Sequence, residues 1–173
     1  MQISDTQKRF IRRWGEMGTR WGIPRSTAMV HGYLYLCRTP VNAEDICAAL
    51  ELARSNVSTS LKELEQFRLI ERESVPGDRR TFYTAVGDVW EMARRILEER
   101  RRRETEGAVA AVNECLLSAR DEGDEFTVTR MEAMQELLNT AENVADAARR
   151  YPTSIFRKAA LMGGKLLGLI AKL

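Results

Sequence analysis

Apolar residues recur every three or four positions along most of the chain, and this spacing predicts a largely helical protein. The first such stretch runs from about Ser4 to Trp21 and the second from about Arg25 to Arg38, with Gly22 and Pro24 between them. Because the apolar stripe of a helix has to be covered by another surface, we expect both helices to pack against the rest of the fold. The expected inward positions of the first are Phe10, Ile11, Trp14, Met17 and Trp21.

Two short helices joined by a tight turn are predicted next. Asn42 can cap a helix from Ala43 to Leu50, whose first turn carries two acids where the helix dipole favours them. A turn at about Glu51 to Ala53 leads into a further helix, Arg54 to Phe67. The inward positions of that helix are Val57, Leu61 and Leu64. This arrangement is a helix-turn-helix unit.

Beyond Phe67 the pattern changes from a helical period to alternation. Leu69 to Val75 alternates enough for a short strand, Pro76 to Arg80 forms a turn, and Thr81 to Thr84 is the returning strand. A hairpin in this place is a wing.

The C-terminal half is predicted to be helical throughout. One long helix should run from Asp88 to about Arg120, with the charged stretch Glu98 to Glu106 in solvent, and this favours a solvated face for the Arg100 to Arg103 run. The helix from about Thr127 to Arg150 has coiled-coil-like spacing. Its seam positions are Met131, Met134, Leu138, Ala141, Ala145 and Ala148. The last helix has an apolar face formed by Phe156, Ala159, Ala160, Gly163, Leu167 and Ile170. Four cations interrupt this last segment, so we expect it to bury one face and not to cross a membrane.

The predicted fold class is mainly α with a small β-hairpin wing: a winged helix-turn-helix plus long N- and C-terminal dimerisation helices. Residues 1–24 form an N-terminal helix for dimerisation or packing, 25–86 the winged helix-turn-helix domain, and 87–173 a C-terminal helical dimerisation region. The apolar stripes of the N- and C-terminal helices are larger than the winged-helix domain can cover. We therefore expect two copies of the chain to cover each other's stripes across a twofold axis.

Composition narrows the class of protein. Of the 173 residues 44% are hydrophobic and 30% charged, and the net charge of +2 leaves nucleic-acid binding to be judged from local clusters of cations. The cysteines Cys37, Cys47 and Cys115 are expected to be buried reduced thiols, and with His31 as the single histidine no zinc ligand set is recognisable. No cofactor and no catalytic constellation is predicted, so the protein is not expected to be an enzyme. The polar N-terminus lacks a signal-peptide core, which favours the cytoplasm.

The exposed face of the Arg54 to Phe67 helix is polar and contains no acid. It consists of Arg54, Ser55, Asn56, Ser58, Thr59 and Lys62. Asn pairs bidentately with adenine, Ser and Thr hydrogen-bond to base edges or phosphates, and Arg and Lys reach guanine or the backbone. Acids return only at Glu63 and Glu65, so the N-terminal positions are expected to read bases in the major groove of DNA.

The wing adds two adjacent arginines, Arg79 and Arg80. Since alternate strand residues point to opposite faces, we expect one arginine to point at DNA while the other braces the hairpin through Asp78. A narrow minor groove attracts arginine and is the expected contact.

At these residues the chain resembles the MarR-type winged-helix regulators, and more closely their GbsR-like branch. The resemblance covers about residues 5 to 105. The matching stretches are Gly22 to Ser26, Gly32 to Leu36, Ser55 to Ser58, Leu61 to Leu64 and Val75 to Tyr83. It implies a homodimeric, usually repressing regulator whose corresponding helix and wing touch DNA and whose terminal helices form the dimer. Some members respond to small molecules, including choline in one branch.

Two positions depart from that family pattern. Glu51 and Arg68 stand where these proteins often have glycine, and both positions are expected to need a left-handed backbone.

The sequence therefore predicts a regulator that binds specific double-stranded DNA, acting as a homodimeric repressor with a small-molecule effector left open. The alternative is a winged-helix module that docks proteins and never touches nucleic acid. Two further roles are considered: several aromatic residues could form a cage for a quaternary ammonium effector, and His31 could act as a sensor. Packing within the protein is the favoured role for all of these side chains. The cage would use Trp14, Trp21, Tyr33, Tyr35 and Trp90.

Overall fold

The computed structural model describes residues 3–102 and 106–170, without the side chains at 106, 144, 145, 147–149 and 164–170. The chain divides into two compact units, residues 1–92 and 93–173. The predicted seam positions Ala145 and Ala148 and the predicted face positions Leu167 and Ile170 therefore lie outside the described side chains.

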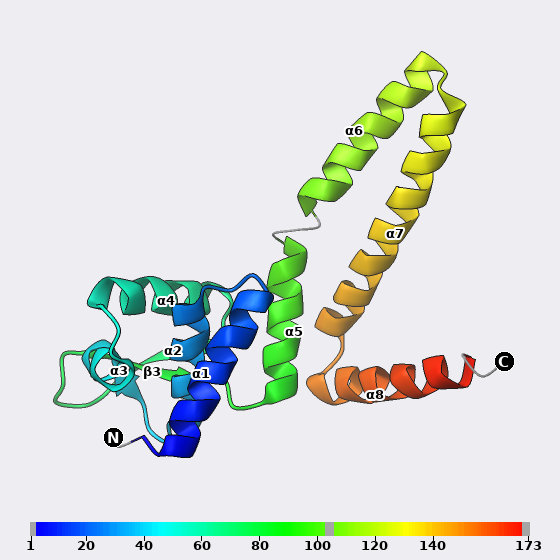
Figure 1. Ribbon diagram of the computed structural model, residues 1–173. Helices are drawn as coiled ribbons and strands as arrows, with labels where there is room; N and C mark the ends of the chain where they lie inside the picture. Colours follow the sequence, from blue (N-terminus) through cyan, green and yellow to red (C-terminus); the bar gives the residue numbers. More distant parts are fainter. Residues whose placement is uncertain (1–2, 103–105, 171–173) are drawn as a thin grey trace. The chain divides into compact units, whose positions relative to one another are not determined.

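The first unit contains the N-terminal helices and the winged helix-turn-helix (Figure 1). Its elements are α1 (Asp5–Arg20), α2 (Arg25–Leu36), β1 (Val41–Asn42), α3 (Ala43–Leu50), α4 (Arg54–Gln66), β2 (Ile70–Ser74) and β3 (Thr81–Ala85). The helix α5 (Val89–Arg100) begins within this unit. The mainly α fold with a small β-hairpin wing is confirmed.

Two glycines of α1 allow this helix to pack closely on α2. A Cβ on Gly18 would lie 2.4 Å from the Cβ of Ala28, and one on Gly15 would lie 2.6 Å from Cγ of Met29. The predicted inward stripe of α1 is therefore only partly right. Ile11 is buried, whereas Phe10 is 36% and Trp21 50% exposed, because the glycine face makes the contact with α2.

The small sheet connects the start of α3 to the wing. Its strand order is β1-β3-β2, all antiparallel, with Val41 opposite Tyr83 and Asn42 opposite Phe82. The two-residue strand β1 is too short to leave an alternating pattern, so the sequence did not predict it. The predicted cap is confirmed, because Oδ1 of Asn42 accepts hydrogen bonds from the backbone N–H groups of Glu44 and Asp45, both at 3.0 Å.

The core of the first unit lies where α2, α3, α4 and the base of the hairpin meet. It consists of Ala28, Val30, Tyr33, Leu34, Val41, Ile46, Val57, Leu61, Leu64, Phe67, Leu69 and Ile70. All three predicted inward positions of α4 are among them. The core thus fixes which face of α4 points outward.

Both positions that depart from the family's glycine pattern have a left-handed backbone, as expected. Glu51 and Arg68 each have a φ of 55°. Each ends a helix with the backbone hydrogen bond of a Schellman motif, Leu52 N–H to Cys47 O at 3.2 Å and Leu69 N–H to Leu64 O at 2.9 Å. The turn geometry is therefore kept without glycine, at a cost of roughly 1 kcal/mol per position.

The second unit contains an antiparallel pair of helices, α6 (Glu106–Glu122) and α7 (Glu125–Arg150), followed by α8 (Thr153–Ile170) (Figure 1). Gly123 turns the chain with a φ of 70°, and Oδ1 of Asp124 accepts a hydrogen bond from Thr127 N–H at 3.0 Å. Leu116 and Ala119 of α6 are buried between the helices. No helix within residues 3–102 and 106–170 is long and apolar enough to cross a membrane.

Three sequence predictions were wrong, two for this half of the chain and one for the cysteines of both halves. The structure has two helices, α5 and α6, where one long helix was predicted. The charged run is not wholly solvated, because Glu99 is 8% exposed and accepts from Nη2 of Arg102 at 2.7 Å. Cys37 and Cys47 of the first unit are half-buried, and Cys115 on α6 is exposed, because the α6–α7 pair leaves one side of each helix open.

Candidate nucleic-acid interface

The polar face predicted on α4 is exposed in the structure. Arg54, Ser55, Asn56, Ser58, Thr59 and Lys62 are all exposed. They surround the side of the helix opposite Val57, Leu61 and Leu64, which are buried. Ala53 at the N-cap of α4 has no side chain that can accept a hydrogen bond. The first backbone N–H groups of α4 are therefore left without a side-chain acceptor. The helix therefore offers donors and small polar groups at its N-terminal half.

The two acids that follow this face are both engaged by neighbouring elements. Glu63 accepts a hydrogen bond from Oγ1 of Thr27 on α2 at 2.8 Å. Glu65 accepts from Nη2 of Arg72 on β2 at 2.7 Å, in an ion pair. The charge of Glu65 is thus compensated by Arg72, and Glu63 is directed at α2, away from the exposed face.

A buried polar contact holds α4 on α2. Thr27 and Ser60 are both buried, and their hydroxyls lie 3.2 Å apart. Sequence reasoning missed this contact, although a signal exists, because Ser60 is a polar residue beside the apolar stripe of α4. Hydrogen bonds between buried groups have strict geometry, so this one fixes the rotation of α4 about its axis.

The wing arginines lie in different surroundings. Arg80 is bound by Asp78: its backbone N–H and its Nε donate to Oδ1 at 2.9 and 3.0 Å, and Nη2 donates to Oδ2 at 2.5 Å. These hydrogen bonds lower the pKa of Asp78 to about 2. The expectation that Asp78 braces one arginine is confirmed for Arg80. Arg79 is exposed and forms no ion pair within the part of the chain that the structure describes.

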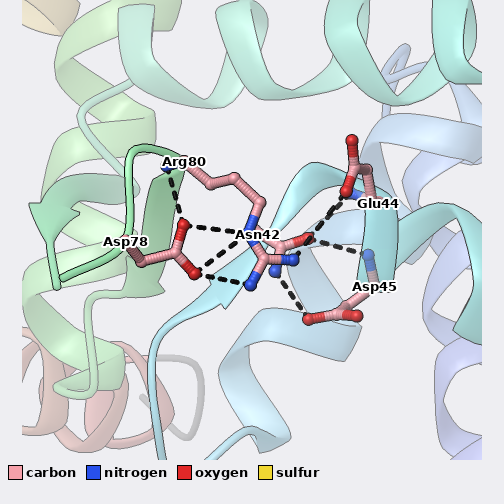
Figure 2. A network of polar contacts seen from close by, with 5 residues as sticks. All are labelled: Asn42, Glu44, Asp45, Asp78 and Arg80. Carbon is pink, nitrogen blue, oxygen red and sulfur yellow. Dashed lines mark hydrogen bonds and ion pairs between the residues drawn. The ribbon is translucent and has the colours of Figure 1, made fainter.

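Arg80 also faces the start of α3, as Figure 2 shows. Its Nη1 lies 3.8 Å from Oε2 of Glu44, and its guanidinium carbon lies 5.6 Å from the centre of the Phe82 ring. Sequence analysis placed Glu44 only in the first turn of a helix, where the helix dipole favours an acid. The position of Glu44 beside the wing depends on the pairing of β1 with β3, which no local pattern indicated.

Three of the aromatic residues weighed as a ligand cage belong to one series of ring contacts with His31: Trp21 contacts Trp14, Trp14 contacts His31, and His31 contacts Tyr35. Tyr33 is buried in the core, whereas Trp14 packs against Phe10 and Trp21 on α1 and against His31 on α2. Nδ1 of His31 accepts from Nε1 of Trp14 at 3.3 Å. Burial lowers the pKa of His31 to about 4, so its ring is neutral at physiological pH. These contacts favour packing.

Comparisons with known proteins agree with this geometry. Residues 34–81, which span the helix-turn-helix and the first part of the wing, match the MarR family model. The chain is similar to the HTH-type transcriptional regulator MmpR5 of Mycobacterium tuberculosis, with 27% identity over 144 residues, 82% of this chain and 84% of that protein. It is also similar to the crystal structure of a transcriptional regulator, with a TM-score of 0.63 and 26% identity over 84% of this chain and 97% of that one.

The fold is that of a MarR-type winged helix. Over the helix-turn-helix and wing the chain is thus similar to the MarR-family winged helix-turn-helix regulators.

Proposed function

We propose that this protein is a sequence-specific double-stranded DNA-binding transcriptional regulator that acts as a homodimer. The observation that carries the proposal is the exposed face of α4, where six polar side chains without an acid stand opposite a buried apolar stripe. A protein-docking helix would need apolar or acidic residues on that face.

Within this proposal the parts of the interface have separate tasks. Asn56, near the N-terminal end of α4, reads a base edge in the major groove, and Lys62 contacts the backbone. Arg79, the wing arginine that Asp78 does not hold, contacts DNA in the minor groove beside α4. Arg80, which Asp78 holds, contacts only the DNA backbone. The remaining contacts come from the small polar side chains Ser55, Ser58 and Thr59, together with Arg54.

The homodimer is proposed from apolar surface that the second unit leaves open. Leu117, Phe126 and Leu137 of the α6–α7 pair are 63%, 71% and 64% exposed. Large exposed apolar side chains on one helical pair indicate a protein–protein surface. We assign dimerisation to residues 1–24 and 87–173, and DNA binding to residues 25–86. A symmetric dimer requires a pseudo-palindromic site with half-sites about one helical turn apart.

The family resemblance adds four further parts to the proposal. These are repression, membership of the GbsR-like branch, a cytoplasmic location and control by a small molecule. A reporter gene placed behind the selected site tests the first of these. Repression predicts higher reporter output when the regulator is deleted.

Selection of bound sequences from random duplex DNA tests the proposed function directly. We expect purified protein to enrich one pseudo-palindromic sequence, with affinity that falls as salt rises because phosphate contacts release counterions. Enrichment of a single half-site would contradict the dimer. No enrichment at either of two salt concentrations would contradict DNA binding and favour the protein-docking module.

A further inference from the structure

An open hollow of about 240 Å³ lies where the starts of α3 and α4 meet Arg80 and the first half of β3. Two arginines line it, Arg54 from α4 and Arg80 from the wing, together with the hydroxyl-bearing Thr81 and Tyr83 of β3. These elements meet because β1, directly before α3, pairs with β3. The hollow is thus a fixed feature of the domain.

This lining is a set of donors suited to a phosphate group. Guanidinium groups bind tetrahedral oxyanions through charge-assisted, often paired hydrogen bonds. Asp78 occupies Nε and Nη2 of Arg80, which holds the side chain in place with Nη1 directed at α3. Arg54 is exposed and forms no ion pair within the described residues.

Glu44 lies at the edge of the same hollow. Its carboxylate is 3.8 Å from Nη1 of Arg80, which is too long for a hydrogen bond, and its side chain is 60% exposed (Figure 2). Such a contact is weak in water. A carboxylate at this place also repels any phosphate that enters.

We propose that the hollow is the seat of one backbone phosphate of the bound duplex, held by Arg54 and Arg80, and that Glu44 occupies its edge until DNA displaces it. The inference rests on the proposed function. It assigns Glu44 as a residue that weakens DNA binding, while Asp78 keeps Arg80 oriented in the unbound protein.

Replacement of single phosphates by neutral methylphosphonates in the selected operator tests the seat. One phosphate in each half-site should weaken binding of the wild-type protein by about tenfold when replaced. The same replacement should leave the Arg54→Gln/Arg80→Gln variant unchanged. Arg38→Gln, which removes an exposed cation from the segment between α2 and β1, is the control and should behave as wild type at every phosphate.

A second measurement uses a variant that is expected to gain affinity, so that a folding defect cannot imitate the result. Glu44→Gln should bind the operator roughly threefold more tightly at low salt, because a carboxylate that repels the phosphate is removed from the edge of the hollow. Glu71→Gln removes the same charge from β2 and should change affinity less than twofold. Unchanged or weaker binding of Glu44→Gln would overturn the assignment.

The outcomes separate the two levels of the proposal. A wild-type protein that selects no duplex contradicts the proposed function. A protein that selects an operator but shows no phosphate coupled to Arg54 and Arg80 contradicts only the phosphate seat. Inorganic phosphate, added at matched ionic strength, should compete no better than chloride; stronger competition would make the hollow a site for free anions and overturn the assignment to DNA.

Discussion

Oγ1 of Thr27 on α2 lies 2.8 Å from Oε2 of Glu63 on α4 and 3.2 Å from Oγ of Ser60. The Thr27 hydroxyl on α2 therefore contacts two polar side chains of α4, the proposed recognition helix. These contacts both stabilise the domain and orient the exposed face of α4.

Thr27→Val should lower the free energy of unfolding by about 1–3 kcal/mol. The substitution keeps the shape but leaves the buried Ser60 hydroxyl without its partner. Chemical denaturation measures the change. Thr59→Val, the same substitution on the exposed face of α4, is the control and should stay within about 0.5 kcal/mol of wild type. Equal stability of Thr27→Val and wild type would show that the contact contributes nothing.

Two variants on the exposed face of α4 should affect DNA binding in different ways. Asn56→Ala should cost about 1–3 kcal/mol and relax the preference at one base position, because a bidentate base contact is lost. Lys62→Gln should weaken binding to all sequences and lower the salt slope by about one. Affinity measured on the operator and its single-base variants at several salt concentrations separates the two. Full affinity of a folded, dimeric Asn56→Ala protein would remove Asn56 from the base-reading set.

His31 should make stability depend on pH in the acidic range. Burial lowers its pKa to about 4 in the folded state, while the unfolded chain has the ordinary value of 6.5. Between these values the unfolded chain binds more protons, so stability is full above pH 6.5 and falls as pH drops towards 4. The total loss is on the order of 3 kcal/mol.

His31→Gln provides the comparison for this prediction. Glutamine can still accept the hydrogen bond from Trp14 but does not titrate, so the fall in stability over that pH range should be much smaller. Denaturation curves collected across the range give the answer. A wild-type fall no larger than that of His31→Gln would assign the acid sensitivity to other groups.

Glu51→Gly should stabilise the protein by up to about 1 kcal/mol. Glu51 has a φ of 55°, a conformation that glycine adopts without a Cβ penalty. Thermal and chemical unfolding both report the change. Ala48→Gly, within α3, is the contrasting variant and should destabilise by about 1 kcal/mol. If Glu51→Gly also destabilised, the cost of the left-handed turn would be smaller than the entropy that glycine adds to the unfolded chain.

Local patterns were sufficient wherever the physical cause is local. The cap at Asn42 follows from residue type and neighbouring residues, whereas the left-handed turns at Glu51 and Arg68 were expected from the family resemblance. The buried stripe of α4 follows from helical spacing, and with it the exposed positions on the other side. The same argument failed for α1, where Gly15 and Gly18 form the contact surface and displace Phe10 from the interior.

By itself the sequence determined the helix-turn-helix, the hairpin and the non-acidic face that the proposed function uses, because helical and strand periods and turn chemistry act over a few residues. Only the tertiary structure decided which partners these residues meet. The β1–β3 pairing brings Glu44 to Arg80, and the packing of α2 on α4 brings Thr27 to Ser60 and Glu63. Such contacts join residues more than 30 positions apart. A local sequence pattern cannot predict them, because they depend on how the whole domain folds.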